Sequence, residues 1–462
     1  MDGLNESLEK MRGEGVADAA IETFRHHYER LRDGDLGTLA EADIEPIEAP
    51  PDAEELPEDE AGASEALDRA VVLKLNGGLG TSMGLDGPKS LLEVKHGQTF
   101  LDVIVRQVLA LRARYEARLP LLLMNSFSTR EATLAALERH PGIAADIPID
   151  FVQNKVPKLG VDDLRPVSWP DNPALEWAPP GHGDLYPALV GSGMLDTLLE
   201  NGYRYAFVSN SDNLGAALDP RILEWFAREK IPFLMEVADR TDADRKGGHL
   251  AALPDGGLVL RESAQTPEDD TDAFEDVRRH RYFNTNTLWL NLRALADTLE
   301  RRGGILPLPM IANRKTVDPS DKSSPDVIQI ETAMGAAIGV FEGARAVRVP
   351  RSRFAPVKTT ADLLAVRSDA YVLTEEAHVE LAPERGGSPS IVELDSRFYK
   401  LLPDFEPRFP AGAPSLLACD RLKVVGDVAF GSGVVVRGAV VVDNPDDDQL
   451  RVADGAVLEG EG

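Results

Sequence analysis

The chain has 462 residues, and its 43% hydrophobic and 27% charged composition excludes a fibrous or wholly disordered protein. Its 78 acidic residues outnumber 49 basic ones, and the net charge of −29 disfavours nucleic acid and anionic membranes as partners. A single cysteine, Cys419, excludes an intramolecular disulfide framework. Neither a secretory signal nor an apolar stretch of about 18 residues is evident, so we expect a cytoplasmic protein without membrane spans.

The N-terminal region divides into two parts. Apolar residues from Leu8 to Phe24 recur at three- and four-residue steps, which predicts a helical segment within residues 5–40. Residues 41–68 are acidic and proline-rich, and such a segment repels itself and buries little surface. We therefore predict a helical segment followed by an acidic linker or solvated arm over residues 1–69, rather than an interaction tail.

From Ala70 onward, short apolar runs alternate with helical periodicity. Expected strands cover residues 71–75, 121–124, 203–209, 232–237 and 281–290, and expected helices include 101–111 and 221–229. Strands that alternate with helices predict parallel βαβ units and an α/β doubly wound sheet that is covered on both faces. We assign residues 70–365 to this sheet domain and 366–415 to a connecting segment.

The C-terminal residues 416–462 show a different period. Leu422, Val428, Val434 and Val440 are spaced by six, and the same register resumes at Val452 and Leu458. An apolar residue at every sixth position is typical of a parallel β-helix, whose coils share one core. Two ordinary hairpins are the alternative.

The first candidate site is a glycine-rich segment, LNGGLGTSMGLDGPKS, at residues 75–90. Glycines directly after a strand allow backbone N–H groups to face an anion. The spacing matches neither the dinucleotide fingerprint nor the Walker loop. Lys89 would supply the positive charge that an acidic protein needs near a phosphate; a plain turn with a surface lysine is the alternative.

Two polar loops are further candidates. Asp212 follows an apolar strand, where open α/β sheets hold ligands, and its carboxylate suits Mg²⁺. An Asx turn that caps the next helix is the alternative. His182 lies between two glycines after two prolines, and we expect an exposed imidazole that bonds a phosphate or sugar, or else a packed loop histidine. No second histidine stands at metal-ligand spacing.

Two polar segments complete the set. Arg351, Arg353 and Lys358 form a basic cluster on an acidic background, which indicates either an anion site or a solvated basic loop. Asn284 and Asn286 lie two residues apart on one expected strand, and therefore on one face. They suit sugar hydroxyls or a polar sheet face.

Taken in order, these strings resemble the eukaryotic-type UTP–glucose-1-phosphate uridylyltransferase family. The resemblance covers residues 70–440 and rests on LNGGLGTSMG, LLLMNSF, PPGHGDLY, FVSNSDNLGA, FNTN-x-LW and VPRSRFAPVKTT. It implies a nucleotide-sugar-binding, GT-A or Rossmann-like mixed-sheet domain and a left-handed parallel β-helix at the C-terminus. The implied reaction converts UTP and glucose 1-phosphate to UDP-glucose and pyrophosphate with Mg²⁺.

The resemblance also implies roles for individual residues. The nucleotide would be lined by Leu75, Asn76, Gly77 and Gly78, and its uracil would be read by Gln153. Both nucleotide and substrate would be contacted by Gly181 and His182. The sugar and the metal would be held by Asn210, Ser211 and Asp212, the sugar also by Asn286, and the phosphates by Lys89 and Lys358. Val152, Ser211 and Thr287 depart from the family pattern, and assembly as a homo-oligomer is left open.

Three alternatives remain at this point. The first is a pyrophosphorylase for another sugar phosphate, N-acetylglucosamine 1-phosphate or galactose 1-phosphate. The second is a glycosyltransferase that consumes a UDP-sugar, although two basic sites for a triphosphate argue against it. The third is a catalytically silent nucleotide-sugar sensor, which would have no need of the two lysines.

Overall fold

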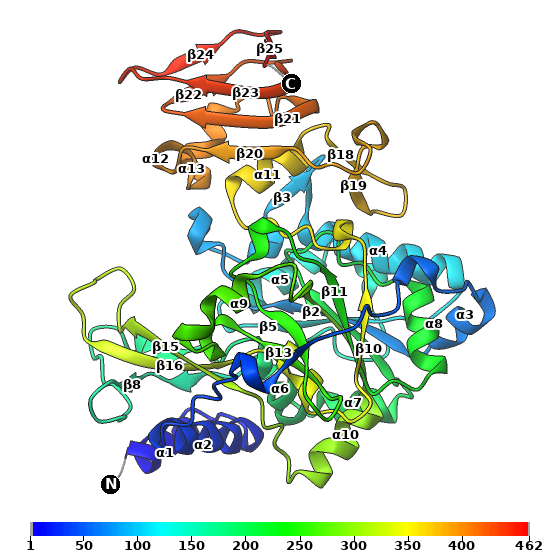
Figure 1. Ribbon diagram of the computed structural model, residues 1–462, viewed down its shortest axis with the longest axis vertical. Helices are drawn as coiled ribbons and strands as arrows, with labels where there is room; N and C mark the ends of the chain where they lie inside the picture. The colour runs from blue at the N-terminus through cyan, green and yellow to red at the C-terminus, as the bar shows by residue number, and fades with distance from the viewer. Residues whose placement is uncertain (1–2, 461–462) are drawn as a thin grey trace.

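A ten-stranded mixed sheet forms the centre of the computed structural model, which describes residues 3–460 (Figure 1). Its main path runs β1-β12-β14-β10-β2-β5-β6, and β13, β11 and β17 join at its sides. The strands are β1 (Glu45–Pro46), β2 (Ala70–Asn76), β5 (Leu121–Asn125), β6 (Asp150–Val152), β10 (Tyr205–Asn210), β11 (Phe233–Asp239), β12 (His249–Ala252), β13 (Leu258–Arg261), β14 (Tyr282–Asn291) and β17 (Arg345–Arg348). The predicted parallel units are present in β10, β2, β5 and β6, but β14 runs antiparallel to β10 and β11, so the sheet is mixed.

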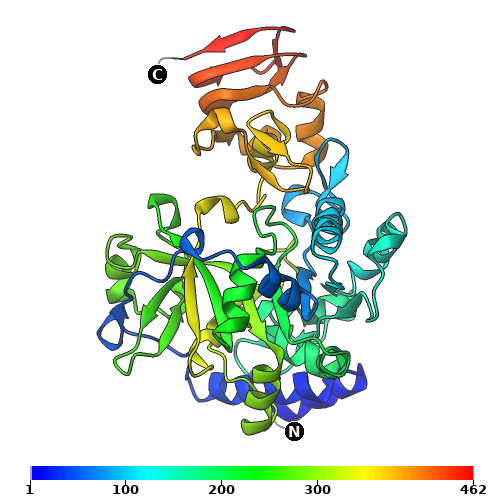
Figure 2. The ribbon, with the colours of Figure 1, turned by 90° about the vertical axis from the view of Figure 1, so that its right-hand side faces the viewer.

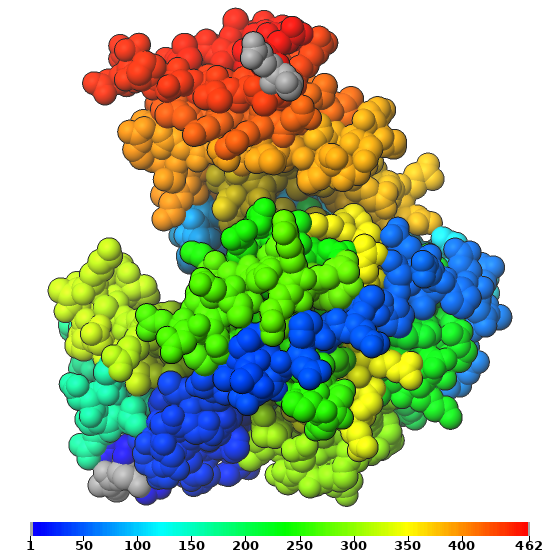
Figure 3. Space-filling model, viewed as in Figure 1, coloured from blue at the N-terminus to red at the C-terminus, as the bar shows by residue number. Residues whose placement is uncertain are grey.

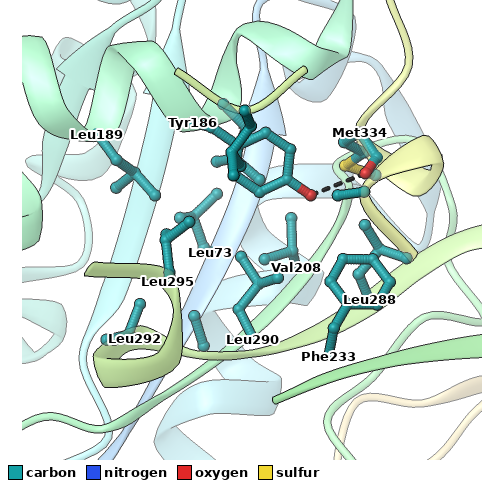
Figure 4. Packing of buried hydrophobic residues seen from close by; sticks show 14 of the residues in the cluster. Leu73, Tyr186, Leu189, Val208, Phe233, Leu288, Leu290, Leu292, Leu295 and Met334 are labelled. Carbon is teal, nitrogen blue, oxygen red and sulfur yellow. Dashed lines mark hydrogen bonds between the residues drawn. The ribbon is translucent and has the colours of Figure 1, made fainter. Parts of the chain in front are cut away.

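Helices cover both faces of this sheet. Alternate residues of β2 enter opposite cores, Val71 and Leu73 on one face and Ala70 and Val72 on the other, as period-two geometry requires. The first face packs against α6 (Leu185–Gly191), α7 (Met194–Glu200) and α10 (Leu292–Arg301); the second packs against α4 (Phe100–Tyr115), α5 (Arg130–Leu137) and α8 (Pro220–Arg228). Figure 4 shows the first core, in which the Tyr186 hydroxyl donates a hydrogen bond of 2.7 Å to the carbonyl of Met334.

The N-terminal helices α1 (Gly3–Gly13) and α2 (Asp18–Arg32) confirm the predicted helical segment. They share an apolar core with a three-stranded sheet, in which Leu8 and Phe24 meet Leu159 and Ile328. That sheet comprises β15 (Met310–Thr316), β16 (Asp326–Thr332) and β8 (Leu159–Gly160), and β7 (Val156–Pro157) pairs with β9 (Trp177–Ala178) nearby.

Most residues of the acidic segment are exposed, as expected, but the segment packs along the main body instead of extending away from it as an arm. Strand β1 pairs with β12 at the sheet edge, Glu41 forms ion pairs with Arg261 and Arg279, and Asp52 pairs with Arg348. Figure 3 shows the segment as a continuous band across the surface of the main body. Glu41 and Asp52 thus meet arginines from distant parts of the chain, and these pairs offset part of the self-repulsion that the composition suggested.

The C-terminal part is built of parallel strands at the end of the molecule opposite to α1 and α2 (Figures 1 and 2). Strands β20 (Ile391–Leu394), β21 (Ser415–Val425), β23 (Val435–Asp443) and β25 (Val457–Glu459) form one sheet, and β22 (Val428–Phe430) pairs with β24 (Leu450–Val452). Every pairing in these two sheets is parallel, so the hairpin alternative is wrong. The six-residue period identifies buried positions correctly, because Leu422, Val428 and Val434 are fully buried and Leu422 stands opposite Val440.

The remaining elements are short. They are α3 (Glu60–Leu67), α9 (Thr271–Glu275), α11 (Thr360–Arg367), α12 (Ser396–Tyr399) and α13 (Leu402–Phe405), with strands β3 (Glu93–Lys95), β4 (Gln98–Thr99), β18 (Tyr371–Leu373) and β19 (Val379–Leu381). Among residues 3–460, no helix has the length and apolar character needed to cross a bilayer. The domain boundaries at 69, 365 and 415 stay predictions.

Candidate functional site

The glycine-rich segment folds as a closed loop after β2. The N–H of Lys89 donates to the carbonyl of Gly78 at 3.1 Å, and Leu79 bridges to Pro88, so the loop returns to its own base. A β-carbon at Gly77 would lie 2.5 Å from Oε1 of Gln153, whereas one at Gly78 would meet no atom within 4 Å. The loop therefore has close contact with Gln153 on one side and open space at Gly78.

Lys89 and Asp212 meet directly. The Lys89 ammonium donates to Oδ2 of Asp212 at 2.7 Å, and the two side chains are 15% and 26% exposed. The Asp212 loop is held against β2, because both the N–H and the hydroxyl of Ser211 donate to the carbonyl of Leu75, at 3.1 and 2.9 Å. Parallel pairing aligns the ends of β2 and β10, which brings these two segments together.

One carboxylate is the available anchor for a metal at this point. Residues 3–460 contain no group of three or more His, Cys, Asp or Glu side chains arranged to hold an ion. Mg²⁺ is usually bound by one or two carboxylates together with substrate phosphates and water, rather than by an all-protein cage. Asp212 is therefore compatible with a magnesium ion that arrives with a phosphorylated ligand.

Lys358 approaches the same loop through its backbone. The N–H of Val357 donates to the carbonyl of Asp212 at 3.1 Å, and Ala355 N–H donates to Oδ1 of Asn213 at 2.9 Å. The Lys358 ammonium, however, lies 5.8 Å from the ring centre of Phe354 and lines a cleft of about 1490 Å³. Lys89 and Asp212 do not line this cleft, so the structure brings the segment to the site without directing its ammonium at Asp212.

The two arginines of the basic cluster are already neutralised. Arg353 forms a buried ion pair of 2.7 Å with Glu236, and Arg351 pairs with Asp244 at 2.8 Å. Neither is a free anion site; Arg353 is largely buried, whereas Arg351 stays exposed, as the solvated-loop alternative expected. Beside the Arg353 pair, burial lowers the pKa of Lys74 to about 7, and its ammonium donates to the Ser209 hydroxyl at 2.6 Å.

His182 is half-buried rather than exposed, which corrects the sequence-based expectation. Its Nδ1 accepts a hydrogen bond of 3.0 Å from the N–H of Met334, and Gly181 and Gly183 let the loop pack against Thr332. Burial lowers the pKa of His182, and Glu331 opposes that shift. A neutral imidazole that accepts at Nδ1 carries its proton on Nε2, which makes Nε2 a hydrogen-bond donor.

A buried carboxyl that the sequence analysis did not single out follows two residues later. Asp184 accepts hydrogen bonds from the backbone N–H and the side-chain amide of Asn154, at 2.6 and 2.9 Å. Burial raises the pKa of Asp184 to about 7, and the bonds from Asn154 oppose that shift. The Gln153 N–H donates to the carbonyl of Asn125 at 2.8 Å, so the Gln153 turn is tied to two elements.

A strand irregularity presents the two asparagines. The pairing of β14 with β11 shifts register between Met235 and Val237, which leaves extra residues of β14 in a bulge, and Asn286 has a φ of +58° there. The side-chain amide of Asn284 donates to Oδ1 of Asn286 at 2.9 Å, which confirms that the two share a face. Bulges and non-glycine residues with positive φ concentrate near functional sites.

Glu262 lies in the same cross-strand row as Asn284, with Gly248 between them, and was also missed. It follows β13, and a β-carbon at Gly248 would overlap its carboxylate, so the glycine makes room for it. His249 stands opposite Phe283 in β14, which sets Gly248 next to Asn284 in the neighbouring row. Burial raises the pKa of Glu262. The missing side chain at Gly248 was the available sequence signal.

Three further residues predicted for the site, Asn76, Asn210 and Leu75, lie at the ends of β2 and β10. Asn76 is buried, and its amide donates to Oδ1 of Asn125 at 2.7 Å and to the hydroxyl of Thr133 at 3.0 Å, so it supports the sheet edge. Asn210 ends β10 and is half-buried. Leu75 is half-buried and holds Ser211 through its carbonyl.

Comparisons with known proteins point in one direction. A family model described as UTP–glucose-1-phosphate uridylyltransferase matches residues 21–437. The enzyme of that name from Solanum tuberosum is 46% identical over 406 residues, which cover 87% of this chain and 83% of the relative. The Saccharomyces cerevisiae enzyme is 43% identical over 394 residues, covering 85% of this chain and 77% of the relative.

Solved structures agree over the full length. A variant of UDP-glucose pyrophosphorylase from Leishmania major, in complex with UDP-glucose, matches with a TM-score of 0.92 at 47% identity. The match covers 100% of this chain and 99% of that one. UDP-glucose phosphorylase from Trypanosoma brucei matches with a TM-score of 0.89 at 46% identity, covering 99% and 98% of the two chains.

Proposed function

Because the chain belongs to the UTP–glucose-1-phosphate uridylyltransferase family, we propose that it converts UTP and glucose 1-phosphate to UDP-glucose and pyrophosphate. The observation that carries this proposal is the direct pairing of Lys89 with Asp212 beside the glycine loop. An ammonium and a carboxylate at the end of two parallel strands are the groups that a triphosphate and its counter-ion require.

The reaction needs positioning more than acid–base chemistry. The oxygen of the sugar phosphate is already anionic, so it attacks the α-phosphorus of UTP in line, and pyrophosphate leaves from the opposite side. Catalysis then consists of holding the two anions at the right distance and neutralising their charge. Lys89 and Lys358 are proposed to do this, together with N–H groups of the loop at Gly77 and Gly78.

A magnesium ion, held by Asp212, would supply further charge neutralisation for the triphosphate. The support for it is one carboxylate at the correct sheet edge and the preference of Mg²⁺ for phosphate oxygens. Lys89 occupies one oxygen of the same carboxylate, so ion and ammonium would share Asp212 or exchange positions on it.

We propose the other roles from the family resemblance and from the contacts. Gln153 is proposed to read the uracil edge, since its amide lies against Gly77. His182 would donate from Nε2 to an oxygen of the bound substrate, and Gly181 would allow the loop to approach closely. Asn210 and the pair of Asn286 with Asn284 would bond the glucose hydroxyls, and Glu262 would add a carboxylate acceptor at the same face.

Finer features of the fold belong to the same proposal. We propose that the C-terminal parallel strands form a β-helix, because the offset from Leu422 to Val440 equals three six-residue sides of one coil, and that it is left-handed, as the family resemblance implies. Homo-oligomer formation and a cytoplasmic location stay predictions.

The test is pyrophosphate release from UTP with Mg²⁺ and a panel of sugar 1-phosphates. Release with glucose 1-phosphate, and little with N-acetylglucosamine 1-phosphate or galactose 1-phosphate, is the expected result. Preferential release with either of the other sugars would replace glucose as the substrate. No release with any sugar would leave the glycosyltransferase or the sensor, and a UDP-sugar binding assay would separate them from a misfolded preparation.

A further inference from the structure

Two segments of the candidate nucleotide site are joined by one buried carboxyl group. Gln153 and Asn154 follow β6, whereas the 181–184 loop precedes α6, and about 30 residues of chain separate them. Asp184 accepts both the backbone N–H and the side-chain amide of Asn154, so its two oxygens fix the position and the orientation of that residue. Only 3% of Asp184 is exposed, and water therefore does not compete for these bonds.

The neighbours of Asp184 leave it few other partners. It lines a cavity of about 20 Å³ together with Thr332 and with His27 of α2. His27 is buried, its two ring nitrogens have no hydrogen-bond partner among residues 3–460, and burial lowers its pKa to about 3, so it lines the cavity as a neutral ring. His182 is the other titratable group of the loop, and the charge of Glu331 raises its pKa against the effect of burial.

We propose that Asp184 is a positioning residue that locks the Gln153 turn to the 181–184 loop and thereby sets the affinity and base selectivity for UTP. The proposal rests on the proposed function, in which Gln153 reads the uracil. The backbone of this turn is held on one side by the bond from Gln153 to Asn125 and on the other by the bond from Asn154 to Asp184. The Gln153 side chain lies close against Gly77. Loss of the Asp184 anchor would free one side of this turn, while the groups at Lys89 and Asp212 would stay in place.

The experiment compares Asp184→Asn with Asp102→Asn in the full chain. Asp102 is a matched control, since it is 8% exposed and also accepts a backbone N–H, from Thr99, but lies at the start of α4. Loss of a hydrogen bond to a charged group typically changes an equilibrium constant by about 10- to 100-fold, so D184N should raise the KM for UTP by about that factor. We expect kcat to change less than about threefold, and the preference for UTP over CTP to fall in parallel with the rise in KM.

Asn154→Ala removes the same two bonds from the other side. We expect N154A to reproduce the effect, and the double variant N154A/D184N to be no worse than either single variant. N154A also provides the test if D184N does not fold. Unchanged KM and unchanged UTP-to-CTP preference in both variants would overturn the inference. A similar loss in D102N would assign the effect to general destabilisation and overturn it as well.

The pH profile provides a second readout. Because the pKa of Asp184 lies near 7, its carboxyl gains a proton as the pH falls through that value and loses acceptor capacity. The ratio of KM values, D184N over wild type, should therefore shrink as the pH falls from 8 to 6; the titration of UTP itself cancels in this ratio. A constant ratio would contradict the inference. Absence of turnover in the wild type would instead refute the proposed function, which separates the two failures.

Discussion

Replacement of Lys89 by alanine tests the centre of the proposed site. The change removes the ammonium that lies 2.7 Å from Asp212 and leaves that carboxylate without its partner. Removal of one preorganised donor to a developing charge typically costs about 3–4 kcal/mol, or 10²–10³ in rate. A Coulomb estimate agrees, because two unit charges 4 Å apart interact by about 4 kcal/mol at an effective dielectric constant of 20.

The expected result is a fall in kcat/KM of about 10²–10³ with the fold intact. The Lys89 side chain is only partly buried, so the free energy of unfolding should change by about 1 kcal/mol or less. Lys10→Ala is the matched control, since Lys10 is a partly buried lysine paired with Glu176 outside the loop cluster. It should show a similar small change in stability and near-normal turnover.

The assay is steady-state pyrophosphate release, together with urea unfolding of both variants. Near-normal turnover in K89A would refute the assignment of Lys89 to the phosphates. An equal loss of turnover in K10A would show that breaking any lysine–carboxylate pair suffices, and the reasoning from the position of Lys89 would fail.

Three further predictions follow from the same structure. Lys358→Ala should lower kcat/KM by about 10²–10³ without loss of stability, and near-normal turnover would show that its ammonium stays in the cleft over Phe354. Asp212→Asn should raise the magnesium concentration needed for half-maximal activity, whereas an unchanged magnesium titration would contradict the metal assignment. Lys74 binds its proton less tightly in the folded state, so it makes the free energy of unfolding increase with pH between about 7 and 10. In urea unfolding, the wild type should gain about 3 kcal/mol relative to Lys74→Met over that window. Parallel plots of unfolding free energy against pH for the two proteins would contradict the lowered pKa.

Much of the site could be predicted from local patterns, because the ends of parallel strands meet at one edge of the sheet. The sequence analysis placed the glycine loop and the Asp212 loop each after a strand; parallel pairing of β2 with β10 brings the two together, and Ser211 joins them through Leu75. The six-residue period was equally local, since each apolar residue marks one side of a coil. In both cases the spacing along the chain determines the neighbours in space.

The features that the sequence analysis missed depend on partners far along the chain. Alternation along β14 does not reveal that β11 lacks the matching residues, so the bulge at Asn286 was not predicted. The composition indicates that the acidic segment repels itself, but it does not show that Arg261 and Arg348 at the sheet edge form ion pairs with that segment. Arg353 was read as a free cation for the same reason, because its partner Glu236 lies on another strand.

The excess of negative charge does not oppose a polyanionic substrate in the way that the composition suggests. Arg351, Arg353 and Lys89 are each paired with a carboxylate, so these three cations are held in neutral pairs before a ligand binds. Of these pairs, Arg353 with Glu236 is the most buried, whereas Lys89 with Asp212 and Arg351 with Asp244 are partly open to solvent. In the proposed reaction a triphosphate would draw Lys89 from Asp212 more readily than Arg353 from Glu236, and the released carboxylate would then be free to hold a divalent cation. In that proposal the burial of each ion pair, rather than the net charge of the chain, determines which cations contact the substrate.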